Sequence, residues 1–209
     1  MPRSDGPELP ALFRAFERTD QSHLGTFWWG RLSEDIPDAY REAAHRLFDA
    51  AQPGGLDAER ILLPILYLYR HSIEALLKQS IMVSAVLRYE AQDADAENPV
   101  EVEKILTRQI RHKIAEIRDL LDRNLLALGL NPLSDVTSEF LGLLADLDPS
   151  GNTFRFARQL PDVHISLDLP RIMASFDAAF SELIGVREYL TVQVDDQRDW
   201  KDYLDDDFY

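Results

Sequence analysis

The 209-residue chain contains no cysteine. It can therefore form no disulfide, supply no thiol nucleophile and hold no cysteine-ligated zinc or iron–sulfur centre. A lack of cysteine is also typical of proteins in a reducing compartment, so we expect a cytoplasmic location.

Long apolar runs are missing as well. The longest one, Ile61–Tyr69, has nine residues and contains Pro64, whereas a membrane-spanning helix needs about 20. The first residues of the chain also lack the basic and apolar pattern of a secretion signal. We therefore expect neither a membrane span nor a leader.

Motifs that mark nucleotide-binding loops, serine hydrolases and zinc proteases do not occur. The chain has no Gly-x-Gly-x-x-Gly, Gly-Lys-Ser/Thr, Gly-x-Ser-x-Gly or His-Glu-x-x-His sequence. His23, His45 and His164 lack the spacing that is typical of metal ligands. The sequence thus predicts neither a metal site nor a bound cofactor.

Negative charge dominates the composition, with 37 Asp and Glu against 22 Lys and Arg and a formal net charge of −15. Such a surface repels the phosphate backbone of nucleic acids at long range, which disfavours a broad nucleic-acid binder. A local basic patch could still bind RNA or a nucleotide. We therefore expect the main partner to be another protein or a second copy of the chain.

The apolar pattern is helical throughout and predicts an all-α, antiparallel helical bundle. Two long central helices are expected over residues 57–91 and 99–128, the first of them apolar nearly all round. Further helices are expected at residues 7–18, 33–51, 134–147 and from 168 onwards. Residues 149–167 look irregular, with short extended pieces at 154–156 and 163–167. We expect residues 1–194 to form the bundle domain and residues 195–209 an acidic tail.

A line of polar residues interrupts the apolar helix at residues 57–91. Arg70, Glu74 and Lys78 are four positions apart, so they share one side of the helix, and His71 lies alongside Lys78. Two interpretations remain open. Arg70 and Glu74 are either a buried structural ion pair, or part of a polar pocket with catalytic residues Arg70, His71, Glu74 and His112. In the second case His71 or His112 would be the general acid or base.

The predicted helix at residues 99–128 carries a row of basic residues. They are Lys104, Arg108, Arg111 and Arg118, with His112 beside them. This row could bind phosphates or an acidic peptide. Alternatively it is a solvated surface paired with Glu116, Asp119 and Asp122.

The C-terminal segment mixes acidic and aromatic side chains. Residues 195–209 hold seven Asp against two cations, interleaved with large apolar residues. This composition is typical of a segment that docks on a partner, and the predicted partner-binding residues are Trp200, Tyr203, Phe208 and Tyr209. The alternative is an extension of the last helix that packs locally.

The segment Leu68–Lys78, Leu-Tyr-Arg-His-Ser-Ile-Glu-Ala-Leu-Leu-Lys, resembles a helix of bacterial proteins related to the HEPN superfamily (higher eukaryotes and prokaryotes nucleotide-binding). Relatives carry a Gly-His-Asp/Asn-Leu and a Phe-Arg-Tyr-Pro segment further on. Here Arg111–Ile114 keeps the histidine and Phe154–Ala157 keeps Phe-Arg. The resemblance covers residues 61–169, roughly half of the chain.

The resemblance implies an antiparallel helical bundle, often dimeric, of a kind found in RNA-cleaving toxins, phage-defence proteins and nucleotide-binding partners. We expect an interaction or regulatory protein in phage defence or toxin control that acts by binding a protein partner. The alternative is a divergent HEPN-like ribonuclease or nucleotide-binding enzyme, with Lys78, Arg108, Arg111 and Arg155 as ligand-binding residues. A third interpretation is a structural homodimer with residues 27–29, Phe-Trp-Trp, at its interface.

Overall fold

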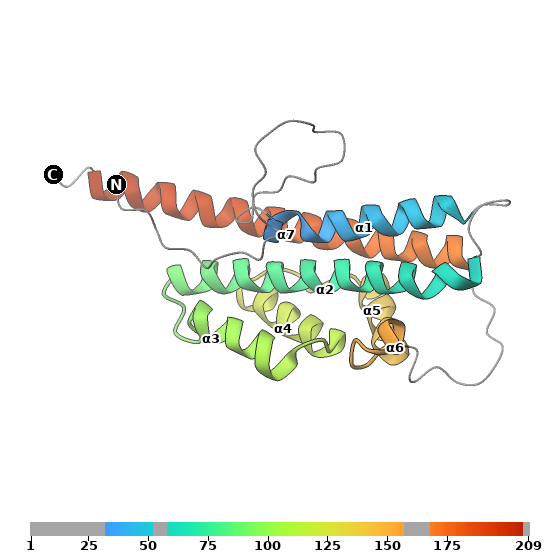
Figure 1. Cartoon of the computed structure of the whole chain (residues 1–209). Coiled ribbons are helices and arrows are strands. Elements are labelled where there is room, and N and C mark those ends of the chain that lie inside the picture. Colours follow the sequence, from blue (N-terminus) through green and yellow to red (C-terminus); the bar gives the residue numbers. More distant parts are fainter. Residues whose placement is uncertain (1–31, 52–57, 157–167, 207–209) are drawn as a thin grey trace, which may run out of the picture. The chain divides into compact units, whose positions relative to one another are not determined.

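The computed structural model describes residues 32–51, 58–156 and 168–206, and all regular secondary structure within them is helical (Figure 1). The elements are α1 (Leu32–Ala50), α2 (Ala58–Glu90), α3 (Pro99–Lys104), the π-helix η2 (Ile105–Ile110), α4 (Ile114–Ala127), α5 (Asp135–Leu147), α6 (Thr153–Phe156) and α7 (Leu169–Asp206). The predicted all-α bundle is thereby confirmed. The predictions for residues 7–18, 27–29 and 163–167 fall outside the described residues.

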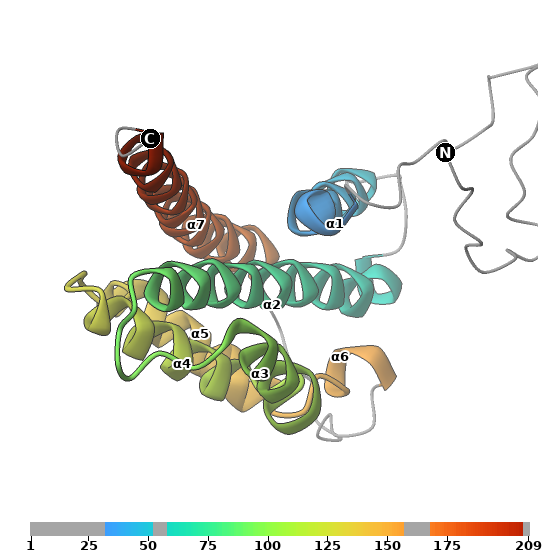
Figure 2. The same cartoon turned by 90° about the vertical axis from the view of Figure 1, so that its left-hand side faces the viewer.

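The helix α2 is the centre of the bundle. It packs against α7 on one side and against α3, α4 and α6 on the other (Figure 2). At about 100° per residue its fully buried side chains cover about half of the helix circumference, and the other half is partly exposed. The largest of them are Ile65, Tyr69, Ile73, Leu76, Leu77 and Ile81.

The helices α4 and α5 run antiparallel, whereas α2 and α7 run parallel. Gln79 contacts Arg187 and Glu90 contacts Arg198, and both pairs are 108 positions apart in the sequence. A constant offset along two packed helices requires that they point the same way. In the hairpin of α4 and α5, by contrast, Asp122 accepts a bond from the Leu133 N–H while Arg118 reaches the carbonyl of Ser138.

The prediction of one continuous helix over residues 99–128 was wrong. The chain passes from α3 into η2, turns at residues 111–113 and starts again as α4. Arg111 has a φ of 58°, a conformation that interrupts any right-handed helix. The break brings the carbonyl of His112 to Arg70 and its ring to Glu74, both on α2.

The segment around α6 also differs from the pattern expected, whereas the helix predicted from residue 168 onwards is present as α7. Residues 153–156 form the helix α6, so the predicted extended piece at 154–156 was wrong. The helix α7 runs without interruption from Leu169 to Asp206, and the described residues from Ser33 onwards belong to one compact unit. Among the described residues, no helix has both the length and the apolar character that a membrane span requires.

Candidate functional site

The polar residues of α2 meet two other segments in a buried ion-pair network. Arg70, which is 3% exposed, donates from Nη1 to Glu74 Oε2 at 2.7 Å and from Nη2 to the carbonyl of His112. Its Nε lies 2.8 Å from Asp148 Oδ2, an ion-pair distance at an angle unsuited to a hydrogen bond. We call Arg70, Glu74, Lys78, His112 and Asp148 the Arg70 cluster.

Glu74 connects the buried Arg70 to the two more exposed residues of the cluster, Lys78 and His112. Its Oε1 accepts from Lys78 Nζ at 2.7 Å and contacts His112 Nδ1 at 2.8 Å. Burial alone would raise the pKa of Glu74, but the bond from Lys78 and the charges of Lys78, Arg70 and His112 lower it. Because an ionised carboxylate can only accept, His112 carries a proton on Nδ1.

The loop between α5 and α6 supplies the third side of the cluster. Asp148 follows the last residue of α5 and is fully buried, and its Oδ1 accepts from the Thr153 N–H at 2.8 Å. Gly151 has a φ of 76°, and a Cβ there would lie 2.8 Å from His112 Cβ and 3.3 Å from Arg70 Nη1. Only glycine fits this position, for both its conformation and its space.

The contacts of the cluster are internal, which favours the structural interpretation. Two buried carboxylates, Glu74 and Asp148, face the cations Arg70 and Lys78. The guanidinium of Arg70 also holds the carbonyls of two loops, so it joins α2 to residues 111–113 and to residue 148. A buried charge needs such partners, and these partners leave Arg70 enclosed.

His71 lies apart from the polar contacts of its neighbours. Its ring stands edge-on to Tyr40, with ring centroids 4.4 Å apart, and stacks on Tyr67 at 5.9 Å. Burial lowers the pKa of His71, which Glu74 opposes and the charge of Arg70 reinforces. Arg155 contacts the ring of Tyr67, with its Cζ 6.0 Å from the ring centroid. The structure therefore groups His71 with Arg155 and aromatic rings.

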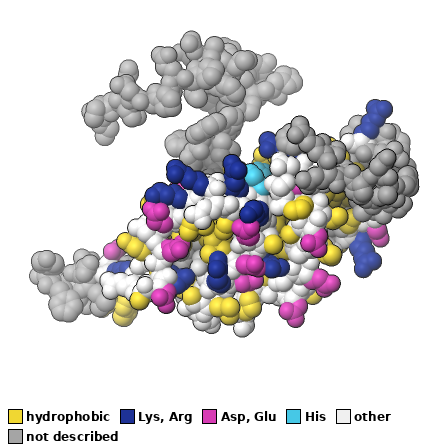
Figure 3. All heavy atoms as spheres, turned by 90° about the horizontal axis from the view of Figure 1, so that it is seen from below, with side chains coloured by type: hydrophobic (Ala, Val, Ile, Leu, Met, Phe, Trp, Pro, Cys, Tyr) yellow, Lys and Arg dark blue, Asp and Glu magenta, His cyan; other side chains and the backbone are white. Residues whose placement is uncertain are grey.

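The basic row predicted at residues 104–118 does not lie on one helix, because the turn at Arg111 divides it. Arg108 and Arg111 are exposed, while Lys104 pairs with Glu101 and Arg118 with Asp119. On the side of the molecule seen in Figure 3, Lys and Arg are interspersed with Asp and Glu. This arrangement is that of a solvated, mixed surface.

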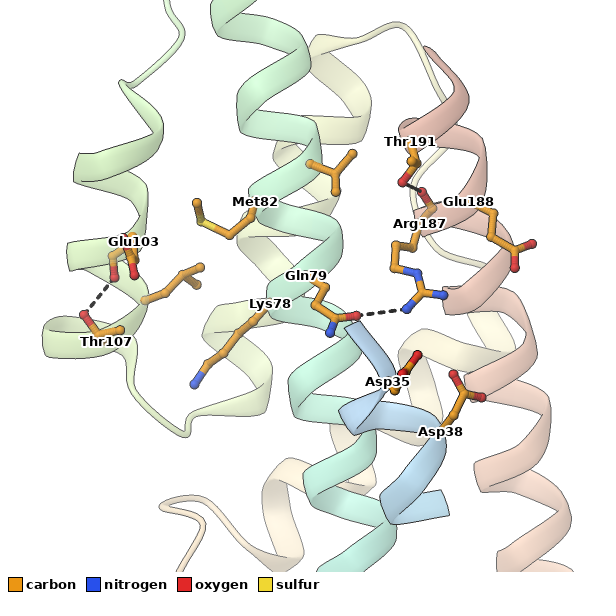
Figure 4. A pocket seen from close by; sticks show the side chains of 12 residues that line it. Asp35, Asp38, Lys78, Gln79, Met82, Glu103, Thr107, Arg187, Glu188 and Thr191 are labelled. Carbon is orange, nitrogen blue, oxygen red and sulfur yellow. Dashed lines mark hydrogen bonds between the residues drawn. The ribbon is translucent and has the colours of Figure 1, made fainter. Parts of the chain in front are cut away.

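An open groove of about 680 Å³ runs along α2 beside Lys78, between α3 and η2 on one side and α7 on the other (Figure 4). Its charged lining residues are Asp35, Asp38, Lys78, Glu103, Arg187 and Glu188. Lys78 is bonded to Glu74, and Arg187 donates to Gln79 Oε1 at 3.0 Å. Four carboxylates against two engaged cations repel phosphate groups, which argues against a nucleotide bound here.

Two of the four predicted partner-binding residues lie in the part of the chain that the structure describes. Trp200 and Tyr203 lie on α7, are 63% and 59% exposed, and stack on each other with ring centroids 6.0 Å apart. Phe208 and Tyr209 lie outside the described residues. The segment is helical through Asp206, and its role in binding a partner stays a prediction.

Two groups of functional contacts were missed by the sequence analysis. One is Asp148, whose distance in sequence from Arg70 left no local pattern to indicate the contact. The other is His45, whose Nε2 lies 3.0 Å from Asp177 Oδ1 and 2.9 Å from Tyr69 Oη. Arg41 pairs with the same carboxylate at 2.7 Å, so this group joins α1 to α2 and α7. The spacing of Arg41 and His45, one helical turn apart, could have indicated it.

Comparisons with known proteins found no relative of this chain. No family model, no curated protein and no solved structure matches the chain. Within the described ranges, no group of three or more His, Cys, Asp or Glu side chains has the arrangement of a metal site.

Proposed function

We propose that the protein is a helical interaction protein that binds a basic protein partner through one face of α7. This outer face consists of Tyr189, Val192, Trp200 and Tyr203, four large side chains that are all about half exposed or more. Two of them are the aromatic residues that the sequence already favoured. The other two extend the surface back into the bundle.

The observation that carries the proposal is that α7 exposes four large apolar or aromatic side chains on a side other than its packed one, around Asp196 at the centre of that side. At about 100° per residue, the four outer side chains fall within an arc of about 80°. The side chains that pack into the bundle, such as Leu183, Leu190 and Val194, are centred about 140° away from that arc. These large exposed side chains are not needed for packing within the chain, and together with Asp196 they support a mixed apolar and acidic binding surface.

The charges beside the outer face indicate the chemistry of the partner. Asp195, Asp199 and Asp202 follow one edge of the face, Asp196 lies within it, and all four are exposed. Asp195 also interacts electrostatically with Arg198, whose pKa its charge raises. Arg198, on another side of the helix, pairs with Glu90 at 2.6 Å, and Lys201 donates to the Glu90 carbonyl. The helix is thus fixed to α2, while the exposed carboxylates of Asp196, Asp199 and Asp202 can pair with Lys or Arg of a partner.

The same carboxylates disfavour a second copy of the chain on this face. Two such faces brought together would place the aspartate rows in a shared, partly desolvated rim. Like charges in that setting cost several kcal/mol, about as much as a good contact contributes. A partner with apolar residues framed by Lys and Arg avoids this repulsion.

The experiment is quantitative co-purification of the full chain from its own host. We expect a stoichiometric protein companion that Trp200→Ala/Tyr203→Ala releases, with affinity lowered about 30-fold or more, because central aromatic residues contribute about 2 kcal/mol or more each. The matched control is Val100→Ala/Leu126→Ala, which removes exposed apolar residues from α3 and α4. Equal loss of the companion from both variants would contradict the proposal.

A setting in phage defence or toxin control, which the HEPN resemblance implies, stays a prediction. Identification of the companion by mass spectrometry tests it. A nuclease toxin or a phage-encoded protein would support that setting, and a partner with no such role would remove it.

A second function, RNA cleavage by a divergent HEPN-like ribonuclease, is favoured by one observation at His112. Its side chain is 52% exposed, and Glu74 holds the proton on Nδ1, so a neutral ring would offer Nε2 as a base. The test is cleavage of an end-labelled single-stranded RNA by the wild type and by His112→Ala. Activity that is lost in His112→Ala supports this function, and equal or absent cleavage removes it.

A further inference from the structure

The helix α5 carries a ridge of exposed apolar side chains. Val136 is 73% exposed, Leu143 57% and Leu147 59%. Positions that are seven and eleven residues apart return to the same side of an α-helix, so these three side chains form one line. An apolar line of this kind on a soluble surface is typical of an interaction site.

A hollow lies next to the ridge, between α5 and α7. Its volume is about 460 Å³, and Val136, Phe140 and Leu143 form its α5 wall. The opposite wall is made of small side chains, including Ala174, Ser175 and Ala178. Large side chains on one helix and small ones on the next give this face a projection and a recess side by side.

The charges at this hollow differ from those of the rest of the surface. Among the described residues that line it, two are charged, Glu139 and Arg171, and they have opposite signs. The groove beside Lys78 has four carboxylates and two cations, and the whole chain has a net charge of −15. Two acidic molecules repel each other over most of their surfaces, but a neutral apolar face lets them approach.

We propose that two copies of the chain pair through this α5–α7 face. In a two-fold arrangement the ridge of one copy enters the recess of the other, and the reverse contact forms at the same time. Glu139 of each copy then faces Arg171 of its counterpart. The occupant is a second copy because the face carries both halves of the contact, in shape and in charge. The outer face of α7, residues 189–203, is not used.

The test is sedimentation equilibrium of the full chain between about 1 and 100 µM, a range that brackets the dissociation constants of moderate protein contacts. We expect a dimer for the wild type and a monomer for Leu143→Glu. The matched control is Leu126→Glu, which places the same charge on an exposed leucine of α4. This control remains dimeric. A wild type that stays monomeric at the highest concentration, or equal dissociation in both variants, would overturn the proposal.

A charge exchange keeps the test decisive even if Leu143→Glu does not fold. Arg171→Glu places two glutamates opposite each other and is expected to weaken the dimer at least tenfold. Glu139→Arg combined with Arg171→Glu restores opposite charges and is expected to regain most of that loss. If the double variant is as weak as the single one, the two residues do not face each other and the arrangement is wrong. Retained dimerisation with lost partner binding in Trp200→Ala/Tyr203→Ala separates this inference from the proposed function.

Discussion

The Arg70 cluster and the outer face of α7 reverse the usual relation between side-chain type and environment. In the cluster, the charged groups of Arg70, Glu74 and Asp148 are buried, and their contacts go to other parts of the same chain. On the outer face, both the aromatic rings and the neighbouring carboxylates are exposed. Charges enclosed by the fold contribute to structure, whereas apolar side chains left outside it are available for binding. The four experiments below test this distinction, from the largest expected effect to the smallest.

Removal of the buried guanidinium gives the largest effect. Arg70→Met leaves Glu74 and Asp148 without their shared cation, and we expect the free energy of unfolding to fall by about 3–5 kcal/mol. The matched control is Arg46→Met, since Arg46 and Glu42 form a pair of the same spacing whose side chains are 78% and 61% exposed. That change should cost no more than about 0.5 kcal/mol. Urea unfolding measures both, and equal losses would contradict a structural role of the cluster.

The glycine over the guanidinium gives the next effect. Gly151→Ala and Gly129→Ala each force a residue with a side chain into a positive φ, which costs about 1–2 kcal/mol. At Gly129 the new Cβ meets nothing within 4 Å, whereas at Gly151 it meets His112 and Arg70. We therefore expect Gly151→Ala to lose at least about 1 kcal/mol more, because overpacking adds to the strain. Thermal unfolding of the pair gives the difference, and identical losses would show that the loop moves away freely.

The aspartate row beside the outer face should affect binding and leave stability unchanged. Asp195→Asn, Asp199→Asn and Asp202→Asn together are expected to lower the association rate for the basic partner about tenfold, with little change in the dissociation rate. Stopped-flow or surface-based kinetics at two salt concentrations measures this effect. A rate that depends on salt as strongly in the variant as in the wild type would place the electrostatic contact elsewhere.

The smallest effect concerns the pH dependence contributed by His71. Burial lowers the pKa of this ring in the folded state, so below about pH 6.5 the unfolded chain binds a proton more readily than the native one. The free energy of unfolding should therefore fall as the pH falls through that range. We expect His71→Gln to show a smaller loss between pH 7.5 and 5.5 than the wild type. Equal losses would mean that the ring is not desolvated.

The helical pattern of the sequence was sufficient for most of the fold. Residues 33–51, 57–91 and 134–147 are helices in the structure within one or two positions of the predicted limits. These segments depend on local periodicity and on local stop residues, such as the cap at Ser134, whose side chain accepts from the Thr137 N–H. Local information of this kind is present in a single sequence.

The turn at Arg111 could not be predicted in the same way, because it has neither glycine nor proline. Its contacts are with α2, where Arg70 holds the carbonyl of His112 and Glu74 holds the ring. One indication was present. The buried positions Val102, Leu106, Ile110 and Ile114 are each four apart, and in an α-helix such steps rotate by about 40° each. A regular α-helix would have carried them away from one face.

The candidate surfaces were only partly predictable for a related reason. Composition placed the start of the tail at residue 195, so Tyr189 and Val192 were counted with the bundle. Their exposure becomes clear only when the packed side of α7 is known. Likewise, the partner role of Asp148 depends on a loop that returns to α2 from the end of α5.

Hydrogen–deuterium exchange of the full chain, alone and with its co-purified companion, tests the central claim most directly. The account predicts slower exchange in residues 186–203 of α7 when the companion is bound, and unchanged exchange in residues 70–78 and 111–118. Protection of residues 111–118 with α7 unchanged would contradict it, because the binding surface would then lie at the Arg70 cluster.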